Sequence, residues 1–175
     1  MMIRVQAKNN GIFLGVILVV FTMVLSFVNP LVFLRTKSFL LIVPFFIVLI
    51  KNAFDLRRAN EGFISFKELF LQSFFCSSIA ILICSTFEYF LFNNIYPEMV
   101  DMYRQVSREA LEQSADLFGD EFVEKNMETI ENQDLFGITQ IISLFFTRLL
   151  TPGALLSLIT AILFKKPISK LIKNE

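Results

Sequence analysis

Four runs of apolar residues, each of a length that can cross a lipid bilayer as a helix, take up most of this chain. About 20 helical residues cross a hydrocarbon core roughly 30 Å thick, so an apolar run of about 18 residues or more predicts a membrane span. We expect four spans, at about residues 11–34, 38–54, 66–95 and 136–164, of which the first ends at Phe27 or at Leu34 depending on how Pro30 is accommodated. Too little sequence remains for a separate soluble domain, so we predict a single membrane domain over residues 1–175.

The composition supports this class of protein and excludes several chemistries. Of the 175 residues, 55% are hydrophobic and 18% are charged, whereas charged residues make up roughly 25% of soluble domains. The chain has no histidine, which is the commonest metal ligand and general base. The usual hydrolytic triads and histidine-containing zinc sites are therefore excluded. We expect neither enzymatic activity nor a metal, a cofactor or a nucleic-acid partner.

The N-terminus resembles a secretory signal, because Arg4 and Lys8 precede the first apolar run. The run is longer than the apolar core of such a signal. Asn29, Pro30 and Leu31 follow it in place of a cleavage site between small residues. We therefore expect a first span that is retained.

Helix signals mark the start of the third span and the segment that follows it. Ser65 and Glu68 form a capping box, which predicts a helix that begins directly after Ser65. Residues 96–134 have apolar residues at helical spacing on both sides of a break at Gly119 and Asp120. We predict an extramembrane helical hairpin over about residues 96–134, whose apolar stripe packs on itself or on the membrane surface.

Basic residues are distributed unevenly between the two sides of the predicted topology. With four spans, the termini and the connection between spans two and three share one side, which carries ten basic and four acidic residues. The other side carries five basic residues, against eleven acidic residues in the long connection. Because lysine and arginine are enriched in cytoplasmic loops, we expect both termini in the cytoplasm and the acidic hairpin in the periplasm of a bacterial inner membrane.

Two charged residues, Glu88 and Arg148, lie inside predicted spans. A charge at the bilayer centre costs about 2.5–3.5 kcal/mol or more, so such residues usually face inward and pair. Measured from Pro97 and Asp134 as the ends of spans three and four, they lie about 13 and 21 Å deep, an offset of about 8 Å. Glu88 and Arg148 are a candidate intramembrane pair, in reach of each other if the helix ends differ by a few residues.

Such a pair allows several interpretations. It can form a proton-linked or anion-binding site, or a structural ion pair that fixes the register of spans three and four. Glu88 can instead stay uncharged, because burial disfavours an ionised carboxylate. Arg148 alone can bind the phosphate of a lipid from the outer leaflet.

Small residues line the side of span three that carries Glu88, and a matching row lies on span four. In lipid, small residues let helices approach closely. We expect both rows to pack helices together, and a substrate groove is the alternative. The rows are Ser77 and Cys84 on span three, and Gly153, Ser157 and Ala161 on span four.

Prolines interrupt the second and fourth spans, at Pro44 and at Pro152 followed by Gly153. Pro152 has no N–H to donate to the carbonyl of Arg148, four residues earlier, so we expect a kink one turn from the buried cation. Broken spans often line the binding sites of transporters, although proline kinks are also tolerated in other membrane helices.

Three stretches together resemble one protein family. They are KNAFDLRRANEGFISFKELF at residues 51–70, FEYF at residues 87–90 and TPGALLSLITAILFKK at residues 151–166. The pattern resembles, over nearly the whole chain, the small bacterial four-span membrane proteins known as domain of unknown function 4199. The resemblance implies the topology and no activity. Genes of this family can lie beside one for a polyprenyl-phosphate glycosyltransferase, so the resemblance makes such an enzyme a candidate partner.

These observations predict an all-α integral membrane protein, a four-helix bundle with an acidic helical hairpin between spans three and four. Our leading hypothesis is a non-enzymatic accessory or interaction subunit of a membrane complex, since packing faces and a charged hairpin occur without a catalytic constellation. The alternative is a small transporter or lipid-handling protein that uses Glu88, Arg148 and the kink at Pro152. The expected partners are membrane lipid, and a membrane protein or a second copy of this chain.

Overall fold

The computed structural model describes residues 2–132 and 134–166, and of residues 2–4 and 37–40 it describes the backbone only. Lys170 and Lys173, which contribute to the predicted cytoplasmic charge, lie outside the described residues, as do the side chains of Arg4 and Lys37. All regular elements in this part of the chain are helical, apart from an isolated antiparallel bridge between residues 64 and 166.

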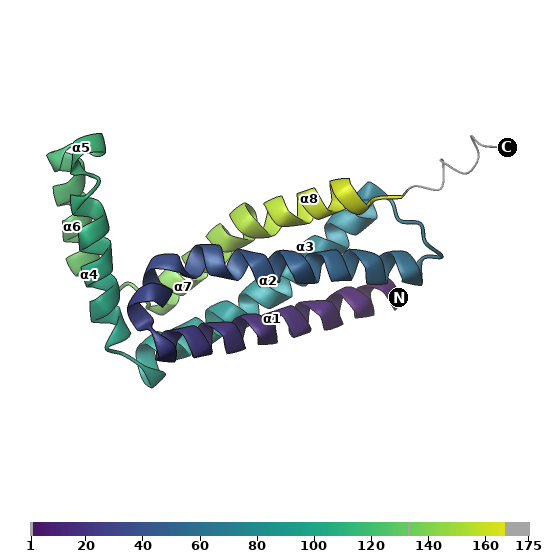
Figure 1. Ribbon diagram of the computed structural model, residues 1–175, viewed down its shortest axis with the longest axis horizontal. Helices are drawn as coiled ribbons and strands as arrows, with labels where there is room; N and C mark the ends of the chain where they lie inside the picture. The colour runs from purple at the N-terminus through teal and green to yellow at the C-terminus, as the bar shows by residue number, and fades with distance from the viewer. Residues whose placement is uncertain (1, 133, 167–175) are drawn as a thin grey trace.

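The long apolar helices run side by side along the longest axis of the molecule (Figure 1). α1 packs against α2 and α3, and α8 packs against the same two helices. The first three long helices are α1 (Met2–Val28), α2 (Pro30–Ala59) and α3 (Phe66–Phe90). Helix α3 continues as the π-helical turn η1 (Leu91–Ile95). The last long helix consists of α7 (Ile138–Arg148), the π-helical turn η2 (Leu149–Gly153) and α8 (Ala154–Phe164).

Within the described residues, three helices are long and apolar enough to cross a membrane: Val5–Val28, Phe66–Ile95 and Ile138–Phe164. A fourth span results if the two parts of α2, Pro30–Thr36 and Leu41–Ala59, are taken as one across their bend of 62°. The bend lies in the helical turn before Pro44. A proline ring clashes with the carbonyl four residues earlier, so a bend is expected at this place. The lengths and compositions of these helices are compatible with a membrane protein.

The boundary between the first two helices differs from the prediction. Of the two ends expected for the first span, Phe27 and Leu34, the earlier one is close to the observed end, because α1 ends at Val28 and residues 30–34 belong to α2. Asn29 caps α2, because its side-chain oxygen accepts a 3.1 Å hydrogen bond from the Val32 N–H. Pro30 occupies the first helical position, where the backbone N–H would have no acceptor within the helix, so the absence of an N–H in proline costs no hydrogen bond. The predicted start of the second helix at residue 38 is therefore too late.

Three shorter helices stand at one end of the long ones and point away from their axis (Figure 1). α4 and α6 lie side by side, and Arg108 on α4 forms a 2.7 Å ion pair with Glu131 on α6. Arg35 on α2 forms a 2.6 Å ion pair with Glu109, which links α4 to α2. The bounds of these helices are Met99–Glu112 for α4, Ala115–Phe118 for α5 and Asp120–Asn132 for α6.

α1 and α3 approach each other closely at two glycines. A Cβ added at Gly11 would lie 2.8 Å from the carbonyl oxygen of Cys76, and one at Gly15 would lie 2.8 Å from Cδ1 of Ile83. The two glycines have the GxxxG spacing that lets membrane helices pack backbone to backbone. We did not predict this contact, although the stretch GIFLG carries its signal.

Candidate functional site

Glu88 on α3 and Arg148 at the end of α7 form an ion pair inside the packed helices. Nη1 of Arg148 lies 2.7 Å from Oε2 of Glu88, to which it donates a hydrogen bond. The side chain of Glu88 is 0% exposed and that of Arg148 is 24% exposed. Both residues belong to helices long enough to span a membrane. The structure thus brings the two charged candidates into direct contact.

The helix ends and the directions of the side chains explain this contact. Counted from Ile95 and Ile138, Glu88 and Arg148 lie about 10 and 15 Å along their helices, an offset of about 5 Å. A helical side chain leans toward the N-terminus of its own helix. Because α3 and α7 run in opposite directions, these two side chains lean toward each other and close the remaining offset.

Neither member of the pair has all of its hydrogen-bonding groups satisfied. Oε1 of Glu88 is buried and has no hydrogen-bond partner among the described residues. A guanidinium has five N–H donors, and in the described part of the chain Arg148 uses one of them, toward Glu88. A buried group without a partner costs roughly 1–3 kcal/mol. The pair therefore retains hydrogen-bonding capacity for a further polar group.

The helix continues past Arg148 in the π-helical turn η2, which contains Pro152. Pro152 cannot donate to the Arg148 carbonyl, but a π turn pairs a carbonyl with the N–H five residues on, which here belongs to Gly153. The predicted interruption at Pro152 and Gly153 therefore takes the form of a widened turn within one long helix. Gly153 is buried, and a Cβ added there would lie 3.1 Å from Cδ1 of Ile81 on α3.

The predicted rows of small residues meet in part. Ser77 on α3 and Ser157 on α8 are fully buried, and their Oγ atoms lie 3.1 Å apart. Of the three remaining residues, Gly153 lies close to Ile81 of α3, Ala161 is buried in a cluster with Leu69, and Cys84 is buried in a cluster with Leu14 and Ile81. The serine pair thus joins α3 to α8 at a place separate from the ion pair.

A groove of about 550 Å³ opens beside the ion pair, between α2 on one side and the α7–α8 helix on the other. Arg148 is the charged residue of its lining, and Thr147 and Thr151 supply hydroxyls next to it. The other lining residues are apolar or weakly polar: Leu18, Leu41, Ile42, Phe45, Ile81, Cys84, Pro152, Leu155, Leu156 and Ile159.

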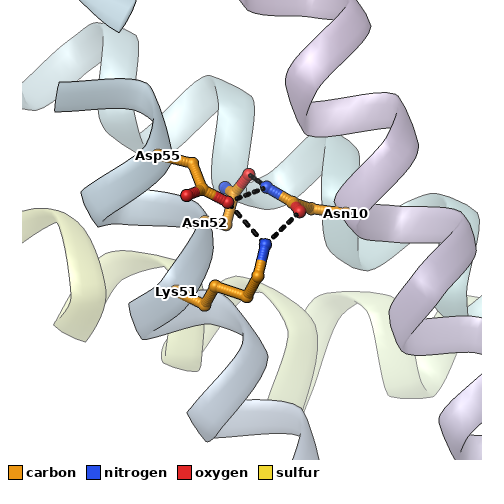
Figure 2. A network of polar contacts seen from close by, with 4 residues as sticks. All are labelled: Asn10, Lys51, Asn52 and Asp55. Carbon is orange, nitrogen blue, oxygen red and sulfur yellow. Dashed lines mark hydrogen bonds and ion pairs between the residues drawn. The ribbon is translucent and has the colours of Figure 1, made fainter. Parts of the chain in front are cut away.

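A second polar cluster, which we did not predict, joins α1 to α2 (Figure 2). Nδ2 of Asn10 donates to Oδ1 of Asn52 at 3.0 Å and to Oδ2 of Asp55 at 3.2 Å. Lys51 donates to Oδ1 of Asn10 at 3.0 Å and forms a 2.6 Å ion pair with Asp55. Asn52 is fully buried and Asn10 is 6% exposed, so this amide-centred cluster is part of the contact between the two helices.

The sequence carried a signal for this cluster. Asn10 and Asn52 are polar residues at the edges of apolar runs, and Lys51 and Asp55 lie within one helical turn of Asn52. One cation and one carboxylate leave the cluster without net charge. Among the described residues, no group of three or more histidines, cysteines and acidic residues could hold a metal ion.

With this geometry established, comparison with known proteins gives one match. A family model described as "Protein of unknown function (DUF4199)" matches residues 9–166. The chain belongs to the DUF4199 family. This confirms the resemblance predicted from the three sequence stretches. No curated protein and no solved structure matches the chain.

The DUF4199 match extends over the ion pair, the groove, the amide-centred cluster and the α4–α6 segment. The description of the DUF4199 family names no activity, so the function of this member has to be argued from these features.

Proposed function

We propose that this DUF4199 protein is an integral protein of a bacterial inner membrane and crosses it four times, as a four-helix bundle with an α4–α6 hairpin outside. The fourth crossing requires that both parts of α2 form one bent span. The turn between α2 and α3 and the end of α8 lie at one end of the long helices, and α4–α6 lie at the other (Figure 1). We assign the first end to the cytoplasm, because it carries basic residues: Lys8, Arg57, Arg58, Lys67, Lys165 and Lys166.

Cysteine accessibility tests this orientation. In a chain with Cys76→Ala and Cys84→Ala, a cysteine introduced by Phe118→Cys should react with a membrane-impermeant maleimide in intact spheroplasts. A cysteine introduced by Asn60→Cys, in the turn between α2 and α3, should react only after lysis. The opposite labelling pattern would refute the proposed orientation.

The role that we propose is that of a non-enzymatic accessory subunit, which docks a partner protein through the end of the α4–α6 pair. The observation that carries this proposal is a docking tip formed by three residues, Leu117, Phe118 and Phe122, which are 81%, 63% and 45% exposed. The ring centroids of Phe118 and Phe122 lie 5.1 Å apart, and Leu117 directly precedes Phe118 in the chain, so exposed apolar residues gather at this end. Large exposed apolar side chains gathered in one place mark an interaction site.

The charge around the docking tip selects the kind of partner. Residues 112–124 contain five acidic residues and no basic residue. An anionic lipid surface would repel this segment, and a second copy of the chain would present the same negative charge. We therefore propose a different protein, with an apolar pocket and a basic rim on the periplasmic side.

Within this proposal, a polyprenyl-phosphate glycosyltransferase is the first partner to test, since the family resemblance implies it. Its fit to the proposal depends on a basic surface at the outer face of the membrane. The pairing of charges on the long helices supports a non-enzymatic role, because Glu88 pairs with Arg148 and Lys51 pairs with Asp55.

Co-purification in mild detergent tests the docking proposal. A stoichiometric partner should accompany the wild-type chain and the control variant Glu128→Ser, which changes an exposed residue of α6 outside the docking tip. The double variant Leu117→Ser, Phe118→Ser should lose the partner, and Asp120→Lys should weaken its binding. A chain that purifies alone, or a partner that stays bound to the tip variant, would refute the proposal.

A further inference from the structure

We propose that the groove between α2 and the α7–α8 helix binds one long-chain fatty acid, with the chain along the apolar walls and the carboxyl group at Arg148. This ligand site lies among the long helices and is separate from the docking tip. The two proposals therefore stand or fall independently.

The position of the groove fits a ligand that enters from the lipid. Its walls come from helices long and apolar enough to span a membrane, with the bent α2 on one side. Ile42 on α2 and Leu155 and Ile159 on α8 line it and are also exposed at the surface of the packed helices. The groove is therefore open sideways, toward the hydrocarbon of the bilayer in the proposed topology.

Arg148 makes this groove different from a simple gap filled by lipid tails. Arg148 lines the groove, and within the described residues its guanidinium donates one hydrogen bond, to Glu88. No water is available in the hydrocarbon region to accept hydrogen bonds from the remaining N–H groups. An occupant that carries acceptor oxygens at the level of Arg148 satisfies them, whereas a plain hydrocarbon chain leaves them unpaired.

The charge of the site favours a carboxylic acid among acidic lipids. Glu88 lies 2.7 Å from Arg148 and already balances its charge. An additional fixed anion would leave a net negative charge in an apolar environment, which is costly. A carboxylic acid can enter in its neutral form. Its carbonyl oxygen then accepts from the guanidinium, and its O–H donates to the hydroxyl oxygen of Thr147 or Thr151, both of which line the groove.

The size of the groove favours a lipid with a single chain. The volume of about 550 Å³ lies within the range of small-ligand pockets. Arg148 lies about 15 Å of helix from Ile138, deep within the α7–α8 span. A small carboxyl group reaches this depth more readily than a bulky, permanently charged phospholipid headgroup.

Binding of radiolabelled palmitic acid to the purified full-length chain in mild detergent tests the proposal. We expect saturable binding with one palmitate per chain. Leu155→Trp, which fills the groove from a lining position, should weaken it by about tenfold or more, as expected for loss of chain and carboxyl contacts. Leu150→Trp is the matched control, because Leu150 is exposed on η2 and lies outside the lining. It should leave palmitate binding unchanged.

Competition with related probes tests the carboxyl group. Hexadecane has the same kind of chain and no acceptor oxygen, and should compete about tenfold less well or worse. If Leu155→Trp does not yield a monodisperse protein, Ile159→Trp replaces it, because Ile159 lines the same groove. Absence of saturable binding, equal binding by the groove and control variants, or equal competition by hexadecane would overturn the proposal. Tighter binding of hexadecyl phosphate would overturn the assignment to a carboxylic acid.

Discussion

Replacing Arg148 while Glu88 remains should destabilise this protein strongly. In Arg148→Met, a Glu88 side chain that is 0% exposed keeps its carboxylate but loses the cation 2.7 Å away. Removing one member of a buried ion pair lowers the free energy of unfolding by about 3–5 kcal/mol, because an uncompensated charge stays buried. Thr147 and Thr151 are nearby hydroxyls, but neither carries the positive charge that Glu88 requires.

The double variant Glu88→Met, Arg148→Met separates pairing from burial. It removes both charges and keeps side chains of similar length, so no unpaired charge remains inside the helices. Replacing a buried ion pair by apolar residues is often neutral or stabilising. We therefore expect the double variant to recover most of the loss, to within about 1–2 kcal/mol of the wild type.

Reversible unfolding in mixed micelles, followed by circular dichroism during titration with dodecyl sulfate, measures these differences. Arg35→Met is the matched control, because it breaks the 2.6 Å ion pair with Glu109, whose side chains are 58% and 38% exposed. An exposed pair contributes about 0–1 kcal/mol, so this variant should unfold close to the wild type. The reasoning is refuted if the double variant loses as much stability as Arg148→Met alone.

Three further substitutions test the contacts between the long helices, each by the same unfolding titration. Gly11→Ala should lower the free energy of unfolding by about 1–3 kcal/mol, because the added Cβ would lie 2.8 Å from the Cys76 carbonyl oxygen, which cannot move without shifting α3. Wild-type stability of this variant would contradict the close approach of α1 and α3. Asn10→Leu should cost about 1–3 kcal/mol, since it removes three hydrogen bonds of the amide-centred cluster, and a neutral effect would show that the cluster is not formed. Ser77→Ala and Ser157→Ala should show a coupling energy of only about 0.6 kcal/mol in a double-mutant cycle, despite the 3.1 Å distance between the hydroxyls; a coupling several times larger would contradict this weak role.

Local sequence signals predicted several helix ends well. The capping box predicts that the third long helix starts after Ser65. In the structure α3 begins at Phe66, and the Ser65 side chain accepts a hydrogen bond from the Glu68 N–H. The break predicted at Gly119 is also found, as a residue with a φ of 85° between α5 and α6. These signals act within one turn of the chain, so the sequence around them is sufficient.

Contacts between distant helices were harder to predict. The sequence predicts Glu88 and Arg148 as a candidate pair. The assumed helix ends place the two residues about 8 Å apart along the helices, which is too far for direct contact unless the ends differ by a few residues. The true ends and the opposite lean of the side chains resolved this. The hydrogen bond between Asn10 and Asn52 joins residues 42 positions apart. It depends on the rotation of α1 against α2, and no local pattern sets this rotation.

The boundary at Asn29 and Pro30 shows why an apolar run alone leaves a helix end open. Hydrophobicity continues from the first helix into residues 31–34, so an apolar run alone places these residues in the first span. The cap at Asn29 and the proline at the first helical position divide the run into two helices. Capping chemistry therefore decided the boundary that hydrophobicity left open.

Site-specific photocrosslinking from position 118 in living cells is the most direct test of the proposed docking role. A photoreactive residue introduced at Phe118, which is 63% exposed in the docking tip, should give one discrete adduct with a second membrane protein. The same residue introduced at Glu128, an exposed position of α6 outside the tip, should not give this adduct. The yield of the adduct from Phe118 should also fall when Asp120→Lys is added. Adducts with lipid alone, or identical adducts from both positions, would contradict the proposal that the tip docks a partner protein.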